Sequence, residues 1–411
     1  MIVVPRPSHP GCRRPAETLR CVCVAALVVA LTACAGAPPA DREPPVPSLD
    51  DLAVGEWRSV VLRGDARCAD GSEYAIQVLP GDRDELLVVF QGGGATWGEL
   101  QDLPLSLRLT FSRLGVPLYT SRVTNVGTLG LAGPPPGAAV HGATQVVISY
   151  CSGDVHWGDA PIGNVDQRGR FVQQRGVDNV LASLAWLEAQ DLAPARVGLV
   201  GCSAGAYGAL LWAPSVQGLY PAAQRSVLLD AGVGVVQAPF LVRGADPPRG
   251  LEAWRAERAF ERNGVAHLLD GLGLDYYLRL LEAVAEVFDG PIGVASTDRD
   301  VVQTLFWYLM GEDFDGFPSD EDELDAFARD TIDDWSTIAV ERLDAAAAIS
   351  GVSTFVSSWT PASQPDVGDG SGHCITTDGA LWSSAGEGAA FRGWWDALRS
   401  GEVPDPVDVR P

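Results

Sequence analysis

Short apolar runs and longer segments with helical spacing alternate along most of the chain. The short runs have the length of buried strands, and they cover residues 74–79, 86–91, 145–150, 196–200, 226–229, 292–296 and 353–357. Helical spacing covers residues 177–190, and helical stretches at 251–290 and 304–347 are expected to add a cap. This alternation predicts the α/β class, with a mostly parallel sheet flanked by helices in a single domain over residues 51–411.

Two segments lack this pattern. Residues 34–50 are Pro-rich and are predicted to form an extended tether. Residues 100–141 are rich in Gly and Pro and separate two predicted strands. A long insertion inside a compact domain usually has a function, so we expect this one to form a lid over a site.

The first 33 residues have the three parts of a secretory signal peptide. Arg13, Arg14 and Arg20 precede an apolar run at 22–31, which is too short to span a bilayer stably. The run ends in Leu-Thr-Ala-Cys34, which resembles a bacterial lipobox and implies that Cys34 is lipidated. The alternative is an ordinary signal cleavage shortly after Cys34.

These features predict an exported protein of the bacterial cell envelope, periplasmic or at the cell surface. The lipid on Cys34 would be its only attachment to a membrane, because no later stretch reaches the roughly 18 apolar residues of a span. We expect the protein to be a monomer.

The charge balance limits the partners. The chain has 29 Lys and Arg against 53 Asp and Glu, a net charge of −24. Such acidity disfavours nucleic acids and anionic surfaces, because binding them needs a positive patch. It also argues mildly against long polyanions, such as de-esterified pectin, as substrates.

The cysteines indicate disulfides. Of the eight, three leave with the signal peptide, and Cys34 would carry the lipid. Cys68, Cys151, Cys202 and Cys374 remain, an even number that predicts two disulfides in an exported chain. No pair has CxxC spacing, so we expect neither a zinc site nor another cofactor.

A Gly-x-Ser-x-Gly pentapeptide follows one of the predicted strands. Residues 201–205 read Gly-Cys-Ser-Ala-Gly, and an Ala/Leu-rich segment that can start a helix follows. Strand, sharp turn and helix are typical of a nucleophile elbow, which exposes the hydroxyl of Ser203 at its apex. The alternative is an ordinary turn with an incidental serine, since the chain contains 46 Gly.

Three glycines, Gly92 to Gly94, close the strand at 86–91. Acyl transfer places negative charge on the carbonyl oxygen, and unobstructed backbone N–H groups must point at that oxygen. A glycine-rich loop and the residue after the serine supply these donors in α/β-hydrolases. Here the donors would be Gly93, or Gly94, together with Ala204. The alternative is a flexible turn.

A serine nucleophile needs a base, and only His267 and His373 follow Ser203 in the chain. His267 lies in a helical segment, whereas His373 lies in a glycine-rich loop soon after the last strand, where this fold supplies its base. The acid that orients the base is expected at a strand end. The candidates are Asp230, Asp298 and Asp300, and spacing does not choose between the last two.

Together these motifs resemble the pectin acetylesterase/Notum carboxylesterase family of α/β-hydrolases. The matching residues lie between about 55 and 385 and comprise Cys68-Ala-Asp-Gly-Ser, Phe90-Gln-Gly-Gly-Gly, Tyr150-Cys-Ser-Gly-Asp-Val, Gly201-Cys-Ser-Ala-Gly, Asp230-Ala-Gly, Asp300-Val-Val-Gln303 and Gly372-His-Cys374. The resemblance implies an α/β-hydrolase fold and a triad of Ser203, Asp300 and His373. It prefers Asp300 because the family's acid is followed three residues later by Gln.

The resemblance also implies a disulfide between Cys68 and Cys151. As a hypothesis, the remaining Cys202 and Cys374 pair and clamp the nucleophile and base loops. The chain departs from the family after the glycines, where Ala95-Thr-Trp97 replaces the usual Trp and Cys. The acyl pocket is therefore expected to differ.

The sequence thus predicts a serine carboxylesterase without cofactor, acting on an acylated small molecule or glycan. Acetyl esters of a polysaccharide are the first hypothesis for the substrate, and longer acyl chains on protein or lipid are the second. A pocket floored by small side chains would favour acetyl, and a deep apolar pocket would favour fatty acyl. Two rivals are a non-catalytic envelope lipoprotein with this fold and cysteine chemistry at Cys202, which needs a free thiolate.

Overall fold

A computed structural model describes residues 45–97, 118–124, 142–165, 171–244, 248, 250–311, 321–361 and 370–411. The signal peptide, Cys34, most of the tether and most of the expected lid at 100–141 lie outside these ranges. No helix in the described part is long and apolar enough to cross a bilayer.

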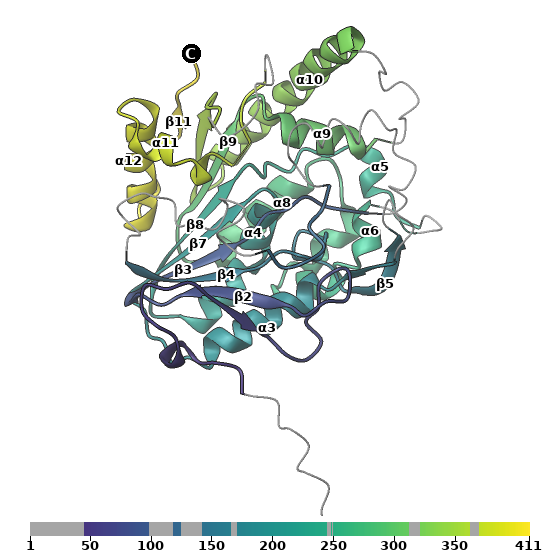
Figure 1. Cartoon of the computed structure of the whole chain (residues 1–411). Helices are drawn as coiled ribbons and strands as arrows, with labels where there is room; N and C mark the ends of the chain where they lie inside the picture. The colour runs from purple at the N-terminus through teal and green to yellow at the C-terminus, as the bar shows by residue number, and fades with distance from the viewer. Residues whose placement is uncertain are drawn as a thin grey trace, which may run out of the picture. The chain divides into compact units, whose positions relative to one another are not determined.

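The described residues form a nine-stranded sheet (Figure 1). Its strand order is β1 (Arg58–Val61), β2 (Ala75–Leu79), β4 (Ala143–Ile148), β3 (Asp82–Phe90), β7 (Arg196–Cys202), β8 (Gln224–Asp230), β9 (Ile292–Thr297), β10 (Val352–Ser357) and β11 (Val407–Asp408). The pairs β1–β2 and β2–β4 are antiparallel, and all other pairs are parallel. This architecture confirms the predicted α/β-hydrolase fold.

Strand residues alternate between two core layers, as a period of two requires. Val88 of β3 and Leu199 of β7 belong to the larger core, which also contains residues of α3 (Gly176–Glu188), α4 (Ala204–Leu219), α8 (Tyr276–Val287) and α10 (Glu321–Ala347). Leu87 and Val200, their neighbours in sequence, belong to a smaller core with α11 (Gly379–Ser383) and α12 (Glu387–Arg399). Figure 1 shows α11 and α12, in yellow, on one side of the sheet and α4 and α8 on the other.

Every strand predicted from an apolar run is present, whereas the sequence analysis missed the edge strands. β1 buries a single residue, and β11 has only two residues, so neither leaves an apolar run. The small sheet of β5 (Ala160–Val165) and β6 (Phe171–Gln174) was not predicted either.

The helical stretches are more broken than predicted. Residues 251–290 form α6 (Gly250–Trp254), α7 (Glu257–Arg262), the 3-10 helix η4 (Ala266–Gly271) and α8. The turn after α7 contains Gly264 at φ 77°, a conformation that favours glycine and ends the helix. The stretch at 304–347 contains α9 (Val301–Leu309) and α10, separated by residues that the structure does not describe. The short α5 (Ala238–Leu241) and 3-10 helices η1 (Leu49–Asp51) and η5 (Ile375–Thr377) complete the elements.

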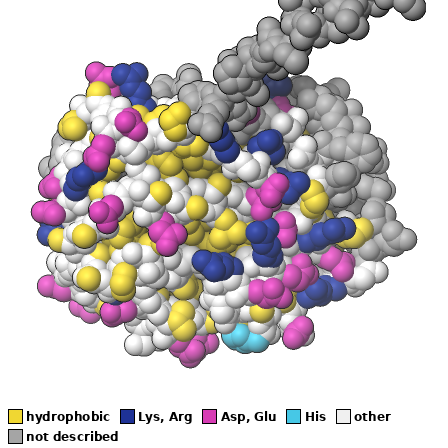
Figure 2. Space-filling model, turned by 90° about the horizontal axis from the view of Figure 1, so that it is seen from below, with side chains coloured by type: hydrophobic (Ala, Val, Ile, Leu, Met, Phe, Trp, Pro, Cys, Tyr) yellow, Lys and Arg dark blue, Asp and Glu magenta, His cyan; other side chains and the backbone are white. Residues whose placement is uncertain are grey.

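On the face shown in Figure 2, Arg side chains lie among Asp and Glu side chains and do not gather into one continuous basic patch.

The turn from β7 into α4 is closely packed. A β-carbon on Gly201 would lie 2.1 Å from the carbonyl oxygen of Gly205, and one on Gly205 would lie 2.0 Å from the carbonyl oxygen of Phe90. Both glycines of the pentapeptide are therefore required by backbone contact. Strand β3, strand β7 and helix α4 meet at this turn.

This contact predicts that Gly205→Ala lowers the free energy of unfolding by about 3 kcal/mol or more, because backbone atoms must move to admit the methyl group. Gly218→Ala, in the same helix, is the matched control, since a β-carbon there meets nothing within 4 Å. Its free energy of unfolding should rise or stay within about 1 kcal/mol of the wild type. Urea denaturation measures both values, and similar values for the two variants would contradict the steric argument.

Candidate active site

Ser203 lies at the apex of the turn between β7 and α4, in a strained conformation. Its φ of 56° and ψ of −126° are rare for a residue with a β-carbon. The Ser203 N–H donates to the carbonyl oxygen of Asp230 at 2.8 Å, which fixes the turn to the neighbouring strand. Helix α4 begins at Ala204, directly after the serine. The N-terminus of this helix favours negative charge beside the hydroxyl.

Asp300 and His373 are hydrogen-bonded to each other. His373 Nδ1 and Asp300 Oδ2 are 2.8 Å apart, and both side chains are buried. Asp300 caps α9, where its Oδ1 accepts from the N–H groups of Val302 and Gln303 at 2.9 Å each. The Gln303 side chain donates to Asp300 Oδ2, also at 2.9 Å. Because the carboxylate accepts, Nδ1 carries the proton and Nε2 carries the lone pair of the neutral ring.

The pKa of His373 is raised above its ordinary value. Burial by itself lowers this pKa, since it disfavours the imidazolium, but the charge of Asp300, its hydrogen bond and the charge of Asp230 outweigh burial. The ring is therefore held in one tautomer, and its protonated form is stabilised. Both properties suit a general base.

The other candidates for the base and the acid have different contacts. His267 is exposed in η4. Asp298 accepts hydrogen bonds from the hydroxyls of Ser358 at 3.1 Å and Ser371 at 3.5 Å. Asp230 accepts from the N–H of Thr376 at 2.8 Å and from its hydroxyl at 2.6 Å, which ties β8 to the loop after His373. Burial raises the pKa of Asp230 to about 6, although these bonds oppose the shift.

The glycine loop after β3 is held by neighbouring segments. The Thr120 N–H donates to the carbonyl oxygen of Gly93 at 2.8 Å, and the Tyr150 hydroxyl donates to that of Gly94 at 2.8 Å. A β-carbon on Gly93 would lie 2.5 Å from the Thr120 hydroxyl. Because C=O and N–H point in opposite directions across a trans peptide, holding the Gly93 carbonyl also orients the N–H of Gly94.

A buried polar network under this loop was missed by the sequence analysis. His156 Nε2 donates to the carbonyl oxygen of Gln91 at 2.9 Å, and burial lowers the pKa of His156 to about 4, so its ring is neutral. Asp154 accepts from the Ser152 hydroxyl at 2.6 Å and from the N–H of Gly176 at 2.9 Å, and burial raises its pKa to about 6. Ser152 and Asp154 belong to the motif that begins at Tyr150, and His156 follows it, but only the fold shows what these residues support.

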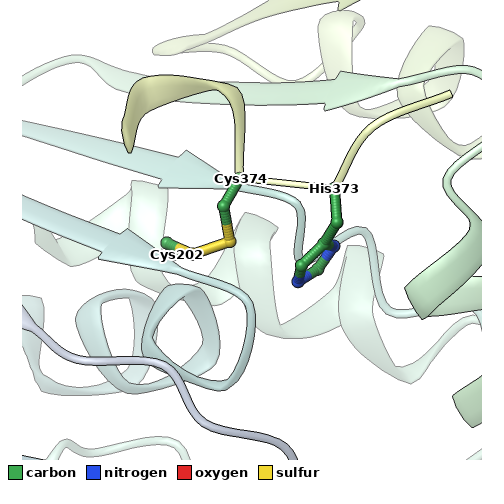
Figure 3. A group of neighbouring side chains, drawn as sticks. All are labelled: Cys202, His373 and Cys374. Carbon is green, nitrogen blue, oxygen red and sulfur yellow. A yellow bond between two sulfur atoms is a disulfide. The ribbon is translucent and has the colours of Figure 1, made fainter. Parts of the chain in front are cut away.

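The described residues contain two disulfides, and these are the two expected pairings. Cys68 pairs with Cys151, with Cα atoms 4.9 Å apart, and Cys202 pairs with Cys374, with Cα atoms 5.6 Å apart. The second disulfide joins the residue before Ser203 to the residue after His373 (Figure 3). A free thiolate at Cys202 is therefore excluded in this structure, which removes the case for cysteine chemistry.

Ser203 and His373 line one cavity, which encloses about 620 Å³ of empty space, part of it open to solvent. Small residues beside the serine are Gly94, Ala95, Ala204 and Ala231. Most other lining residues are large and apolar, among them Trp157, Tyr207, Phe240, Trp254, Tyr276, Phe306, Trp307 and Met310. Several of these rings pack edge to face, such as Phe240 on Trp254 with centroids 5.5 Å apart. The cavity therefore fits an apolar group next to the serine hydroxyl.

Comparisons with known proteins agree with this geometry. The model of a family described as Pectinacetylesterase matches residues 59–239, which confirms the resemblance seen in the sequence. The match includes the glycine loop and the turn at Ser203, whereas Asp300 and His373 lie beyond it. No curated protein sequence matches the chain.

Among solved structures, the chain is similar to the Wnt deacylase Notum from Drosophila. The TM-score is 0.50 at 16% sequence identity, and the similarity covers 86% of this chain and 96% of that one. At this identity the similarity supports the α/β-hydrolase fold.

The contact between Asp300 and His373 predicts that Asp300→Asn lowers the pKa of His373. The amide keeps the shape of the carboxylate but removes its charge, and burial continues to disfavour the imidazolium. Asp298→Asn, two residues away, is the control and should shift this pKa less. NMR of the histidine ring protons across pH measures both variants, and equal shifts would contradict the assignment of Asp300 as the partner.

Proposed function

We propose, starting from the pectinacetylesterase match over residues 59–239, that the protein is a serine carboxylesterase. One observation carries the proposal. Buried Asp300 is hydrogen-bonded to His373, and His373 lines the same cavity as Ser203 at the turn between β7 and α4. Ser203 is the nucleophile, His373 the base and Asp300 the acid that orients the base.

In the first step, the Ser203 hydroxyl attacks the ester carbonyl, and His373 Nε2 takes its proton. The tetrahedral intermediate collapses to an acyl-enzyme when the imidazolium gives that proton to the departing alcohol. Water then attacks the acyl-enzyme through the same base, which releases the acid and restores Ser203. Asp300 keeps its charge throughout and stabilises the imidazolium that forms in each half-reaction.

The developing oxyanion is stabilised by the N–H groups of Gly93 and Ala204, with Gly94 next to them. Ala204 begins α4, so its N–H lies at the positive end of a helix dipole. The hydrogen bonds from Thr120 and Tyr150 hold the glycine loop before substrate arrives. Donors that are already oriented need no reorganisation during the reaction, which is the main source of their effect.

The acyl group is proposed to be longer than acetyl. Acetyl esters of a polysaccharide were the first hypothesis, and the aromatic lining of the cavity supports the second. Trp254, Phe306 and Met310 offer more apolar surface than a single methyl group can cover.

The two disulfides are typical of exported proteins. They support export of the protein. The proposal also includes attachment through lipid on Cys34 and a monomeric state, as expected from the sequence. A non-catalytic envelope lipoprotein remains the rival. A binding protein would not need a buried carboxylate that orients a histidine beside a strained serine, so the site favours catalysis.

The first test is hydrolysis of p-nitrophenyl esters by the wild type and by Ser203→Ala. The variant should lose about 10⁴-fold or more in kcat, because the covalent route is removed. Ser215→Ala, in the same helix but outside the cavity lining, is the control and should keep nearly full activity. Activity that survives in Ser203→Ala would show that the nucleophile is another residue, and an inert wild type would favour the binding protein.

The second test compares acetate, butyrate and octanoate esters on the wild type. If the aromatic cavity takes the acyl chain, kcat/KM should rise by about threefold for each methylene that it buries, until the cavity is filled. In the Trp254→Ala variant, kcat/KM should fall for the octanoate ester and change little for the acetate ester. The reason is that only the longer acyl chain is expected to reach the Trp254 ring. A preference of the wild type for acetate would restore the acetylesterase hypothesis.

A further inference from the structure

Three side chains that can bind a metal ion lie together at the active site. The sulfur atoms of Cys202 and Cys374 and a ring nitrogen of His373 all lie within 4.8 Å of one another. All three residues are buried, at 8%, 3% and 9% exposure. Figure 3 shows the disulfide beside the imidazole, between the end of β7 and the loop that carries His373. The two cysteines are 172 residues apart, so their spacing gave no sign of this cluster.

Two thiolates and an imidazole are a typical donor set for Zn²⁺ and related thiophilic cations, with a fourth position left for water. A histidine that binds a metal almost always donates its other ring N–H to a carboxylate or carbonyl. His373 already does this, because Nδ1 donates to Asp300 at 2.8 Å. Asp300 is in turn fixed by the N–H groups of Val302 and Gln303. The outer contacts of a metal site are thus in place.

In the disulfide form the sulfur atoms carry no negative charge and are bonded to each other, so they do not act as ligands. A dithiol or phosphine reductant changes this. The disulfide takes up two electrons and two protons to give two thiols. A dithiol supplies both and becomes its own disulfide, whereas a phosphine supplies the electrons, takes the oxygen of one water molecule to become its oxide, and leaves the two protons of that water for the thiols. Binding of a divalent cation then releases the two thiol protons, and the two thiolates neutralise the charge of the ion.

We propose that Cys202, Cys374 and His373 form a binding site for Zn²⁺ when their disulfide is reduced, and that the bound ion inhibits the enzyme. Ligands around a tetrahedral zinc are about 3.3 to 3.8 Å apart, so the freed sulfur atoms separate while the imidazole moves little. The carboxylates of Asp300 and Asp230 act on His373 electrostatically and also favour a cation at this place.

The bound ion inhibits because the metal and the proposed reaction both need the lone pair on Nε2 of His373. Nε2 of His373 accepts the proton of Ser203 in the proposed reaction, and the metal would bind the same atom, because Nδ1 is engaged with Asp300. A zinc-bound imidazole is not a base. The oxidation state of Cys202 and Cys374 therefore decides whether His373 serves catalysis or binds the metal. Only this step of the inference rests on the proposed esterase function.

The experiment uses the purified protein reduced with a phosphine in the absence of oxygen, and Co²⁺ as the probe. Co²⁺ occupies sites of this type and absorbs in the near ultraviolet when thiolates bind it. One equivalent should give this absorption, and Zn²⁺ should displace it. His373→Ala keeps both cysteines and should weaken Co²⁺ binding by about tenfold or more, because one of three protein ligands is lost.

The other disulfide offers a matched control. Among the residues that the structure describes, Cys68 and Cys151 have no group of histidine or acidic side chains arranged as a metal site. Cys68→Ser with Cys151→Ser should therefore keep the Co²⁺–thiolate absorption, whereas Cys202→Ser with Cys374→Ser should lose it. In the ester assay, Zn²⁺ should lower the activity of the reduced protein by about tenfold or more and affect the oxidised protein little.

Several results would overturn the proposal. One is the absence of thiolate absorption in the reduced protein, and another is its persistence when Cys202 and Cys374 are serine. Equal inhibition of the oxidised and reduced proteins by Zn²⁺ would also overturn it, as would loss of the far-ultraviolet circular dichroism on reduction, because the site needs the fold. If the protein hydrolyses no ester, the Co²⁺ spectra still test the site independently.

Discussion

The structure depends on one steric constraint, the approach of helix α4 to strand β3. The Phe90 carbonyl oxygen lies where a β-carbon of Gly205 would be, so the helix can lie this close only with glycine there. This approach brings α4 to the sheet immediately after β7, and the connection between them must be a single sharp turn. Ser203 occupies that turn and takes the strained backbone that the geometry imposes.

Once the turn is placed, the parallel sheet brings the other site residues to it. β3 pairs in parallel with β7, β7 with β8, and β8 with β9. The carboxyl ends of these strands therefore lie along one edge of the sheet. The glycine loop follows β3, Asp300 follows β9, and His373 follows β10 after a longer loop. Each chemical group therefore comes from a different loop, and the rigid sheet sets the distances between the loops.

The sequence predicted the parts of this arrangement that have a local signal. Buried strands appear as apolar runs, and Ser203 and His373 are marked by glycine-rich motifs. The choice between Asp298 and Asp300 was not local, since both follow β9. In the structure Asp300 caps α9, and its second oxygen faces His373. The sequence signal that favoured Asp300 was the Gln303 three residues later, through the family resemblance.

The size of the cavity could not be predicted from the sequence either, because its lining residues come from separate elements. Its rings come from α4, α5, α6, α8 and α9 and, for Trp157, from the segment between β4 and β5. The order of these elements in the sequence says nothing about which faces converge. A family resemblance based on strand ends therefore carries information about the chemistry and little about the acyl group.

Both disulfides join buried residues that are far apart in the sequence, by 83 and 172 positions. Strands are held on two sides by their neighbours, whereas the residues just beyond a strand end lose those hydrogen bonds. Cys151 directly follows Tyr150, whose hydroxyl holds the Gly94 carbonyl, and Cys202 directly precedes Ser203. Each cross-link thus restrains the chain within one residue of a candidate site residue or of a residue that holds the glycine loop. Covalent restraint adds to the hydrogen bonds of the sheet at the places where those bonds end.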